Sequence, residues 1–181
     1  PNGTYDLGDK CLTPISGNNI SIIGESMDNT IIVNKPEVEG IGVTATLFNT
    51  STGLYMQDLT LKNTYPFDKS TGRAVCLQDK GTQTICKNVK MLSYQDTYYS
   101  NNNKGQYYFE NSDIHGIVDF ICGGGDVFFN KCTLTLEPGK GSYITAPYTD
   151  GSDYGYVFDG CKIVGSATDS FTSGRSWGGT A

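Results

Sequence analysis

The chain has 181 residues, a formal net charge of −6 and 37% hydrophobic residues, with 12 Tyr and 8 Phe. This length and composition fit one domain with a sizeable core and exclude intrinsic disorder. The acidic balance, without a Lys/Arg cluster, argues against nucleic acid or an anionic membrane as partner, and no apolar run approaches the ~18–20 residues of a membrane span.

Short runs rich in β-branched and aromatic residues alternate with turns of Gly, Asn, Asp and Ser. This pattern is typical of an all-β protein, which leaves a sandwich, a barrel or a solenoid as alternatives. In chain order, the predicted strands are Ile20–Ile23, Thr30–Val33, Thr44–Phe48, Leu54–Leu61, Ala74–Leu77, Gln106–Phe109, Val127–Phe129, Tyr143–Ala146 and Gly155–Phe158.

A four-residue pattern recurs along the chain and decides between these alternatives. A polar residue or glycine is followed by a small or apolar, a polar and an apolar residue at 19–22, 58–61, 88–91, 111–114, 131–134 and 160–163. The spacings are 39, 30, 23, 20 and 29 residues, and the first is interpreted as two coils. Irregular periods of roughly 20–30 residues indicate a solenoid whose turns vary in length. We therefore predict a right-handed parallel β-helix.

Two aspartates share the spacing of one such coil. Asp96 and Asp119 lie 23 residues apart, as do Asn88 and Asn111. In a solenoid, the two carboxylates would occupy the same column on adjacent rungs, roughly 4.8 Å apart. Like charges at that distance push their pKa values apart, so that one carboxylate stays ionised and the other tends to keep its proton. Such a pair can provide a nucleophile and a general acid from one residue type.

The cysteines and the single histidine do not indicate a metal or a hydrolytic triad. Six cysteines contain no CxxC pair, and His115 is the only imidazole. A zinc site or a Ser/His/Asp triad needs more than this, so we expect no cofactor. The predicted columns bring Cys132 and Cys161 together. Stacked free thiols are favoured there, and a disulfide remains an alternative. His115 is interpreted as a surface or rim residue.

Several stretches resemble motifs of the pectin methylesterases, or pectinesterases. Residues 94–99 (YQDTYY) resemble that family's GYQDTLY block, and residues 116–123 (GIVDFICG) resemble its GTVDFIFG block. Residues 72–77 (GRAVCL) are similar to QAVAL, 174–177 (GRSW) to GRPW, and 44–46 to a further substrate-contacting stretch. The similarity covers almost the whole chain in the family's order, and the first two blocks together are highly specific.

The resemblance implies a right-handed parallel β-helix that removes methyl groups from galacturonate esters of pectin through an aspartyl acyl-enzyme. It implies that Asp119 is the nucleophile and that Asp96 acts as general acid and then as general base. Gln95 would donate a hydrogen bond to the oxyanion. Arg175 would pair with Asp119 and orient it, and Trp177 would offer a face for the sugar ring.

Further substrate contacts are expected from Thr46, Tyr99 and Phe120. The chain departs from the family at Arg73, which replaces a glutamine that donates to the oxyanion. We expect Arg73 to reach the groove and to contact substrate or stabilise the oxyanion, with a salt bridge as the alternative. Cys122 replaces an aromatic residue, so one wall of the groove is expected to be looser.

Residues 1–181 are predicted to form a single β-helix catalytic domain, truncated at both ends relative to the family. The expected partner is methyl-esterified homogalacturonan (pectin), with no nucleic acid and no membrane, and the protein is expected to be a monomer that is secreted, periplasmic or on the cell surface. A pectate lyase, a polygalacturonase and a non-catalytic polysaccharide-binding β-helix remain alternatives, although neither a calcium-binding acidic cluster nor a Gly-His-Gly turn is evident.

Overall fold

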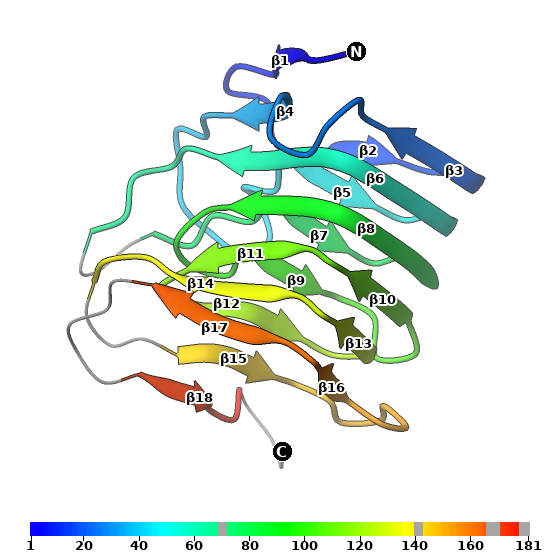
Figure 1. Cartoon of the computed structure of the whole chain (residues 1–181), viewed down its shortest axis with the longest axis vertical. Coiled ribbons are helices and arrows are strands. Elements are labelled where there is room, and N and C mark those ends of the chain that lie inside the picture. Colours follow the sequence, from blue (N-terminus) through cyan, green and yellow to red (C-terminus); the bar gives the residue numbers. More distant parts are fainter. Residues whose placement is uncertain (69–71, 140–142, 166–170, 178–181) are drawn as a thin grey trace.

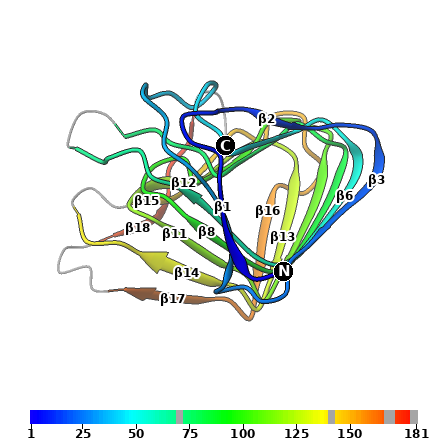
Figure 2. The same ribbon diagram turned by 90° about the horizontal axis from the view of Figure 1, so that it is seen from above.

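The computed structural model describes residues 1–68, 72–139, 143–165 and 171–177 of the chain. Its paired strands run parallel and stack as successive coils around a common axis (Figure 1). Seen along that axis, the coils outline a three-sided tube (Figure 2). The fold is a right-handed parallel β-helix, as the sequence predicts.

Each coil contributes to three faces, which we number. Face 1 contains β1 (Gly3–Asp6), β4 (Thr30–Asn34), the second halves of β6 (Thr52–Asn63) and β8 (Gln83–Leu92), β11 (Asp113–Gly116), β14 (Thr133–Leu136) and β17 (Lys162–Gly165). Face 2 contains β3 (Asn18–Ile23), the first halves of β6 and β8, β10 (Gln106–Glu110), β13 (Asp126–Asn130) and β16 (Tyr156–Asp159). Face 3 contains β2 (Thr13–Ile15), β5 (Leu47–Asn49), β7 (Leu77–Asp79), β9 (Tyr98–Ser100), β12 (Val118–Gly123), β15 (Tyr143–Pro147) and β18 (Thr172–Gly174).

The first residue of the repeated pattern forms the corner between faces 2 and 1. A left-handed φ between 48° and 60° bends the chain there at Asp58, Asn88, Asn111, Lys131 and Gly160. Asn, Asp and Gly enter this conformation more easily than other residues, because their side chains are short or absent. The repeat read from the sequence is therefore a column of corners, and the residues after each corner point into the core.

The interpretation of the 39-residue spacing as two coils is wrong. Ile20 pairs with Leu54 rather than with Leu59, so it lies one coil away and in a different column. The reason is local: β3 ends at Ile23, and a loop precedes β4 at Thr30, whereas β6 continues through its corner without a break. Counted on face 2, the coil from Ile20 to Leu54 is thus 34 residues long, whereas the next one, from Leu54 to Thr84, is 30 residues long.

Two predicted strands begin too early. β5 begins at Leu47 rather than Thr44, and β7 begins at Leu77 rather than Ala74. The residues before them are buried but belong to connections, where the Thr44 hydroxyl donates to the carbonyl oxygen of Gly40 at 2.7 Å. Burial alone therefore does not distinguish these connections from strands.

The core is a set of ladders that run along the axis. One ladder contains the buried Met56, Cys86, Phe109 and Phe129 on four consecutive coils, with the Phe109 and Phe129 rings 5.0 Å apart. The exposed Phe158 continues it on the fifth coil, with its ring 4.6 Å from that of Phe129. Because each rung stacks the same kind of side chain on the last, one apolar core continues through the coils. In the described part of the chain, no helix is long and apolar enough to cross a membrane.

The cysteines are free thiols. Cys132 and Cys161 occupy adjacent coils, since Thr133 pairs with Lys162, and no disulfide joins them. The preference for stacked free thiols is confirmed.

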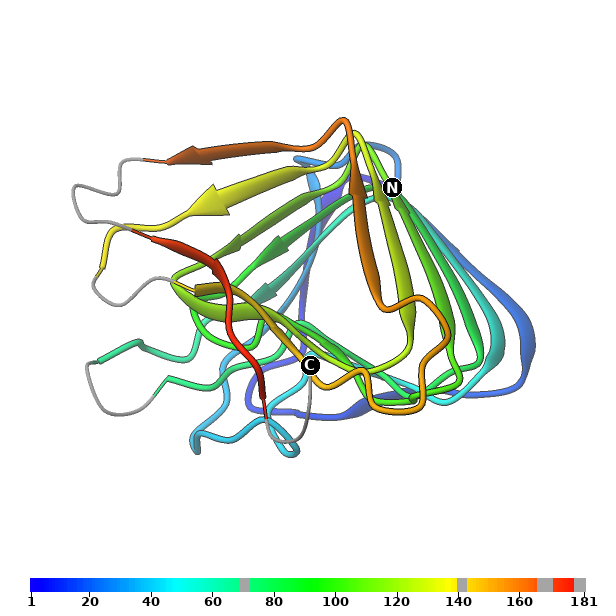
Figure 3. The same ribbon diagram turned by 90° about the horizontal axis from the view of Figure 1, so that it is seen from below.

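The 23-residue interval gives the predicted register. Gln95 pairs with Val118, and Tyr98 pairs with Ile121 on the adjacent strands β9 and β12 of face 3. Asp96 and Asp119 therefore occupy equivalent positions on neighbouring coils, as predicted. The described parts of the connections from face 1 to face 3 gather on one side of the tube (Figure 3).

Candidate active site

The candidate site lies on the outer surface of face 3. Tyr98 and Ile121 fill the core, and the residue after each of them belongs to the opposite side of its strand. An outer column, defined by strand register, runs along the axis through Phe48, Gln78, Tyr99, Cys122 and Ala146. The two aspartates precede this column by a few residues on two adjacent coils.

Asp119 is bound by Arg175, the residue that directly follows β18. Arg175 donates from Nε to Asp119 Oδ1 at 2.9 Å and from Nη2 to Oδ2, which makes a two-point ion pair. The Asp119 side chain is 4% exposed and the Arg175 side chain 44%. The Arg175 backbone N–H donates to the Thr145 carbonyl at 3.0 Å, and its guanidinium lies 5.6 Å from the centre of the Tyr143 ring. A guanidinium in this geometry favours the ionised carboxylate and fixes its direction.

Asp96 has the opposite environment. It is 5% exposed, and burial, followed by the negative charge of Asp119, raises its pKa from 3.8 to about 7. Arg73, Cys122 and Arg175 oppose that rise without cancelling it. Near neutral pH, Asp96 is therefore divided between a protonated acid that can donate and an ionised base that can accept.

Both aspartates adopt a backbone conformation that is unusual for a residue with a side chain. The φ angle is 57° at Asp96 and 49° at Asp119. A left-handed residue of this kind costs on the order of 1–3 kcal/mol and persists only where its surroundings enforce it. The register of β12 against β15 shifts between Val118 and Ile121, immediately around Asp119. The strain sits where the two carboxylates are brought together.

Gln95 lies in the backbone ladder between Arg73 and Val118, directly before Asp96. Its side chain is half-buried, and its amide makes no hydrogen bond to any residue that the structure describes. The amide N–H groups are therefore free to donate to an atom bound over the carboxylates.

Aromatic rings line a cavity of about 300 Å³ on face 3, which Tyr99 borders three residues after Asp96. The Tyr99 ring lies 5.8 Å from the Trp177 ring, and the Tyr148 ring lies 6.3 Å from it. Amide groups of Asn101 and Asn103 border the same cavity, and Asn101 accepts the Tyr99 hydroxyl at 2.9 Å. The structure thus brings together Trp177 and Tyr99, two residues expected to contact substrate, and it adds Tyr148, which belongs to no motif read from the sequence.

Arg73 is engaged by an acidic residue that sequence reasoning did not find. Its Nε donates to Glu39 Oε2 at 2.7 Å, and its Nη2 donates to Oε1. Arg73 still contributes a positive charge that lowers the pKa of Asp96, which places it beside the carboxylates. The salt bridge left open by the sequence is therefore present. Glu39 lies 34 residues earlier in a connection between faces, and nothing in the local sequence marks it.

Two expected substrate contacts are wrong. Thr46 is fully buried, and its hydroxyl donates to Asn34 Oδ1 at 2.7 Å inside the coil. Phe120 is also fully buried and belongs to the apolar core. The left-handed turn at Asp119 breaks the simple alternation of β12, and the Phe120 ring consequently points inward.

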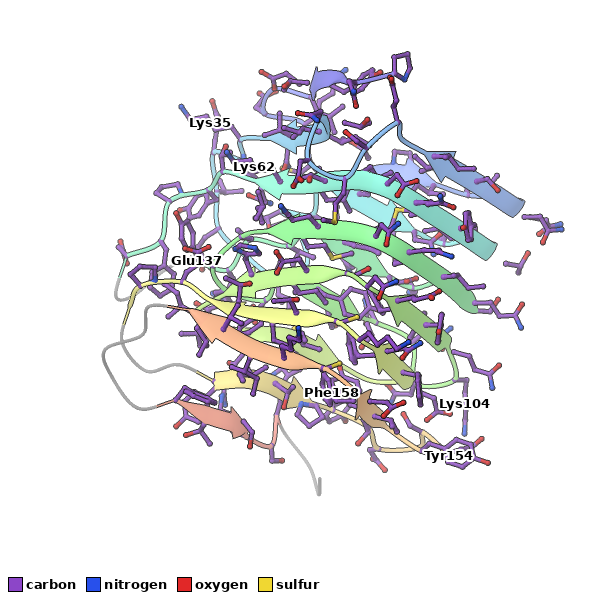
Figure 4. The ribbon with its side chains drawn as sticks, in the orientation of Figure 1. Lys35, Lys62, Lys104, Glu137, Tyr154 and Phe158 are labelled. Carbon is purple, nitrogen blue, oxygen red and sulfur yellow. The ribbon has the colours of Figure 1, made fainter. Side chains whose placement is uncertain are left out.

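His115 lies on face 1 rather than between the aspartates. Its Nδ1 and Nε2 face Glu137 Oε1 at 2.6 Å and Asp113 Oδ2 at 3.0 Å. Burial alone would lower the pKa of His115, but the two carboxylates raise it. Together with Lys62 and Glu137, which are labelled in Figure 4, His115 borders a cavity of about 730 Å³ that contains neither aspartate of the pair.

Across the described residues, no group of three or more His, Cys, Asp or Glu side chains is arranged to hold a metal ion. The chemistry that this site offers comes from its own side chains: an arginine-bound carboxylate, a carboxyl group with a raised pKa, and an unpaired amide. This set fits attack on a carbonyl carbon, proton transfer to a leaving group and stabilisation of an oxyanion.

Comparison with known proteins agrees with this geometry. The model of the pectinesterase family matches residues 2–177. The chain is 31% identical over 172 residues to putative pectinesterase 11 of Arabidopsis thaliana, which covers 94% of this chain and 47% of that relative. It is 33% identical over 174 residues to a pectinesterase/pectinesterase inhibitor of Ficus pumila var. awkeotsang, covering 88% of this chain and 31% of that protein.

Among solved structures, the pectin methylesterase of Erwinia chrysanthemi superimposes with a TM-score of 0.82 at 27% identity, covering 97% of this chain and 60% of that one. A pectin methylesterase in complex with a hexasaccharide gives a TM-score of 0.84 at 27% identity, covering 99% of this chain and 61% of that one. The chain therefore spans roughly a third to three fifths of these relatives' length. On the family match and the shared β-helix together, the chain belongs to the pectinesterase family.

Proposed function

We propose that this chain hydrolyses the methyl esters of galacturonate units in pectin and releases methanol. The observation that carries the proposal is the pairing of Asp119 with Asp96 on adjacent coils, where an arginine binds the first carboxylate and burial raises the pKa of the second. Arg175 grips Asp119 at two points, which suits a nucleophile that must be ionised, whereas the pKa of Asp96 is raised to about 7. The family membership supports an ester as the substrate.

The reaction follows from these environments. The Asp119 carboxylate attacks the C6 carbonyl of the ester, and the Gln95 amide donates to the oxyanion of the tetrahedral intermediate. Asp96 protonates methanol as it leaves, which forms an acyl-enzyme at Asp119. Asp96, now ionised, then takes a proton from the water that attacks the acyl group. This step releases the galacturonate and regenerates the starting enzyme.

The surrounding residues fit a polysaccharide chain in the groove. The cavity bordered by Trp177, Tyr99 and Tyr148 offers ring faces and amide groups, which suit the apolar face and hydroxyl groups of a sugar. We propose that Arg73 contacts substrate through Nη1, because Glu39 occupies only Nε and Nη2. The related methylesterase bound to a hexasaccharide supports an oligosaccharide as ligand.

Pectin as the partner leads to the remaining proposals. Pectin is a cell-wall polymer, so a secreted, periplasmic or cell-surface protein fits this substrate. We propose that the chain acts as a single catalytic domain, that it works as a monomer without nucleic acid or membrane, and that it needs no cofactor.

The test is methanol release from highly esterified pectin, with the Asp119→Asn variant as control. We expect methanol from the wild-type protein and none from the variant. Unsaturated uronates would instead indicate a lyase, and new reducing ends would indicate a hydrolase of the glycosidic bond. Binding of pectin without any product would indicate a polysaccharide-binding protein, and each of these three outcomes contradicts the proposal.

A further inference from the structure

Cys122 lies beside the acid/base aspartate in the outer column of face 3. It follows Asp119 by three residues in β12 and pairs with Tyr99 of β9 and Ala146 of β15. Its side chain is 1% exposed, and its Sγ lies 3.6 Å from the Tyr98 carbonyl oxygen, to which it donates. Its thiol is also within hydrogen-bonding reach of the Asp96 carboxyl group.

The Cys122 thiol remains protonated while Asp96 changes charge. Burial, together with the negative charges of Asp96 and Asp119, raises the thiol pKa well above its ordinary value. The side chain therefore acts as a hydrogen-bond donor, not as a thiolate nucleophile. It has one proton and two acceptors in reach, the Tyr98 carbonyl and the Asp96 carboxyl group.

Which acceptor receives that proton depends on Asp96. A neutral carboxylic acid is a weak competitor for the thiol, whereas an ionised carboxylate accepts a charge-assisted hydrogen bond that is stronger than one to a carbonyl. We propose that Cys122 is a positioning residue whose S–H hydrogen bond moves from the Tyr98 carbonyl to the Asp96 carboxylate when Asp96 ionises. The S–H bond itself does not break.

The consequence for catalysis rests on the proposed esterase function. Asp96 becomes ionised each time it gives its proton to methanol, and it must hold its position until it takes a proton from water. A thiol that donates its hydrogen bond once Asp96 is ionised would stabilise this state and keep the carboxylate directed at the acyl group. An aromatic residue, as in the family motif, has no S–H to donate.

Other charged and titratable groups surround Cys122 and Asp96, and any test must distinguish their effects from that of the thiol. The groups that act on Asp96 or Cys122 are Asp119, Arg73, Arg175, Tyr99 and Tyr156. Variants of Cys122 leave Asp119 and the two arginines in the sequence, so a change confined to those variants reports on the thiol.

The direct test is infrared spectroscopy of the S–H stretch, which needs no catalytic activity. Subtracting the spectrum of Cys122→Ala from that of the wild type isolates the Cys122 band. We expect this band to move to lower frequency as the pH rises through about 7, the pKa of Asp96, because the hydrogen bond strengthens. In Asp96→Asn the band should not move, and Cys11→Ala, which alters a distant thiol, should leave the shift intact. A band that stays fixed in the wild type, or moves equally in Asp96→Asn, overturns the proposal.

The catalytic consequence is tested by pH profiles of kcat/KM. Removing the donor raises the pKa of Asp96, so the alkaline limb of Cys122→Ala should lie roughly 0.5–1 pH unit above that of the wild type. Cys122→Ser retains a hydroxyl donor, and its limb should lie closer to the wild type. Identical limbs in all three proteins contradict the catalytic role. An inactive wild type would contradict the esterase proposal instead, and the infrared result would still decide the hydrogen bond.

Discussion

Two columns of left-handed residues in this β-helix have similar backbones and different chemistry. The corner column between faces 2 and 1 contains Asp58, whose Oδ1 accepts from the Asn88 amide at 2.9 Å in a half-buried setting. The column at the start of face 3 contains Asp96 and Asp119, both buried and both within reach of arginines. The same backbone conformation thus places one aspartate against a neutral amide and two others against each other and a guanidinium, and we propose that only the second arrangement is catalytic.

The difference between the two columns is tested most strongly by removing one carboxylate from each. Asp119→Asn should reduce methanol release on the order of 10³-fold or more, because an amide cannot replace the nucleophile. Asp58→Asn, the matched control in the corner column, should keep wild-type activity. Thermal unfolding should show both variants folded. Residual activity of more than a few per cent in Asp119→Asn would sink its assignment as nucleophile.

Asp96→Asn should lower turnover on the order of 10²–10⁴-fold, since methanol leaves poorly without a proton and the attacking water loses its base. The remaining activity should no longer follow the ionisation seen near pH 7 in the wild type. The check is a pH profile from pH 5 to 8 for both proteins. If the variant matches the wild type across that range, Asp96 is not the acid/base.

The raised pKa of Asp96 also predicts a pH-dependent effect on stability. The folded protein binds this proton up to about pH 7, whereas the unfolded chain releases it near the ordinary aspartate pKa of 3.8. The stability that the proton contributes is fully present below pH 4 and is lost as the pH rises through 7. Asp96→Asn should therefore raise the melting temperature by a few °C at pH 8 relative to its effect at pH 4. A difference that does not change with pH would show that Asp96 has an ordinary pKa.

Substitution of Arg73 should have the smallest effect, and it tests the role of a charge at the border of the site. Because Glu39 already holds two of its nitrogens and the side chain is exposed, Arg73→Gln should change methanol release by no more than about threefold on highly esterified pectin. On pectin of low esterification the loss should be larger, since a cation attracts free galacturonate carboxylates and an amide does not. Glu39→Gln frees the guanidinium and should shift the preference in the opposite direction. Equal rates for all three proteins on both substrates would leave Arg73 as a surface charge.

The sequence predicted the parts of the site that repeat, and it missed the parts that depend on connections. The 23-residue interval placed Asp96 and Asp119 in one column because a β-helix preserves register from coil to coil. β9 and β12, which carry the site, were not predicted as strands, because Asp96 and Asp119 bend the chain there and interrupt the alternation. The same bend explains why Phe120 was wrongly assigned to the groove.

Glu39 and Tyr148 show the other limit of sequence reasoning. Each belongs to a connection between strands, and each reaches the site only through the stacking of coils. No spacing or motif in the chain marks either residue, since the connections differ in length from one coil to the next. The repeat therefore predicts which strands are neighbours, but not which loop residues meet above them.

The division of roles between the two carboxylates is tested most directly by ¹³C NMR titration of the Asp96 carboxyl group in selectively labelled protein. The wild type should titrate near pH 7, and the midpoint should fall in Asp119→Asn, because the neighbouring negative charge is removed. An Asp96 midpoint near 4 in both proteins would contradict the claim that this pair divides the roles of nucleophile and acid.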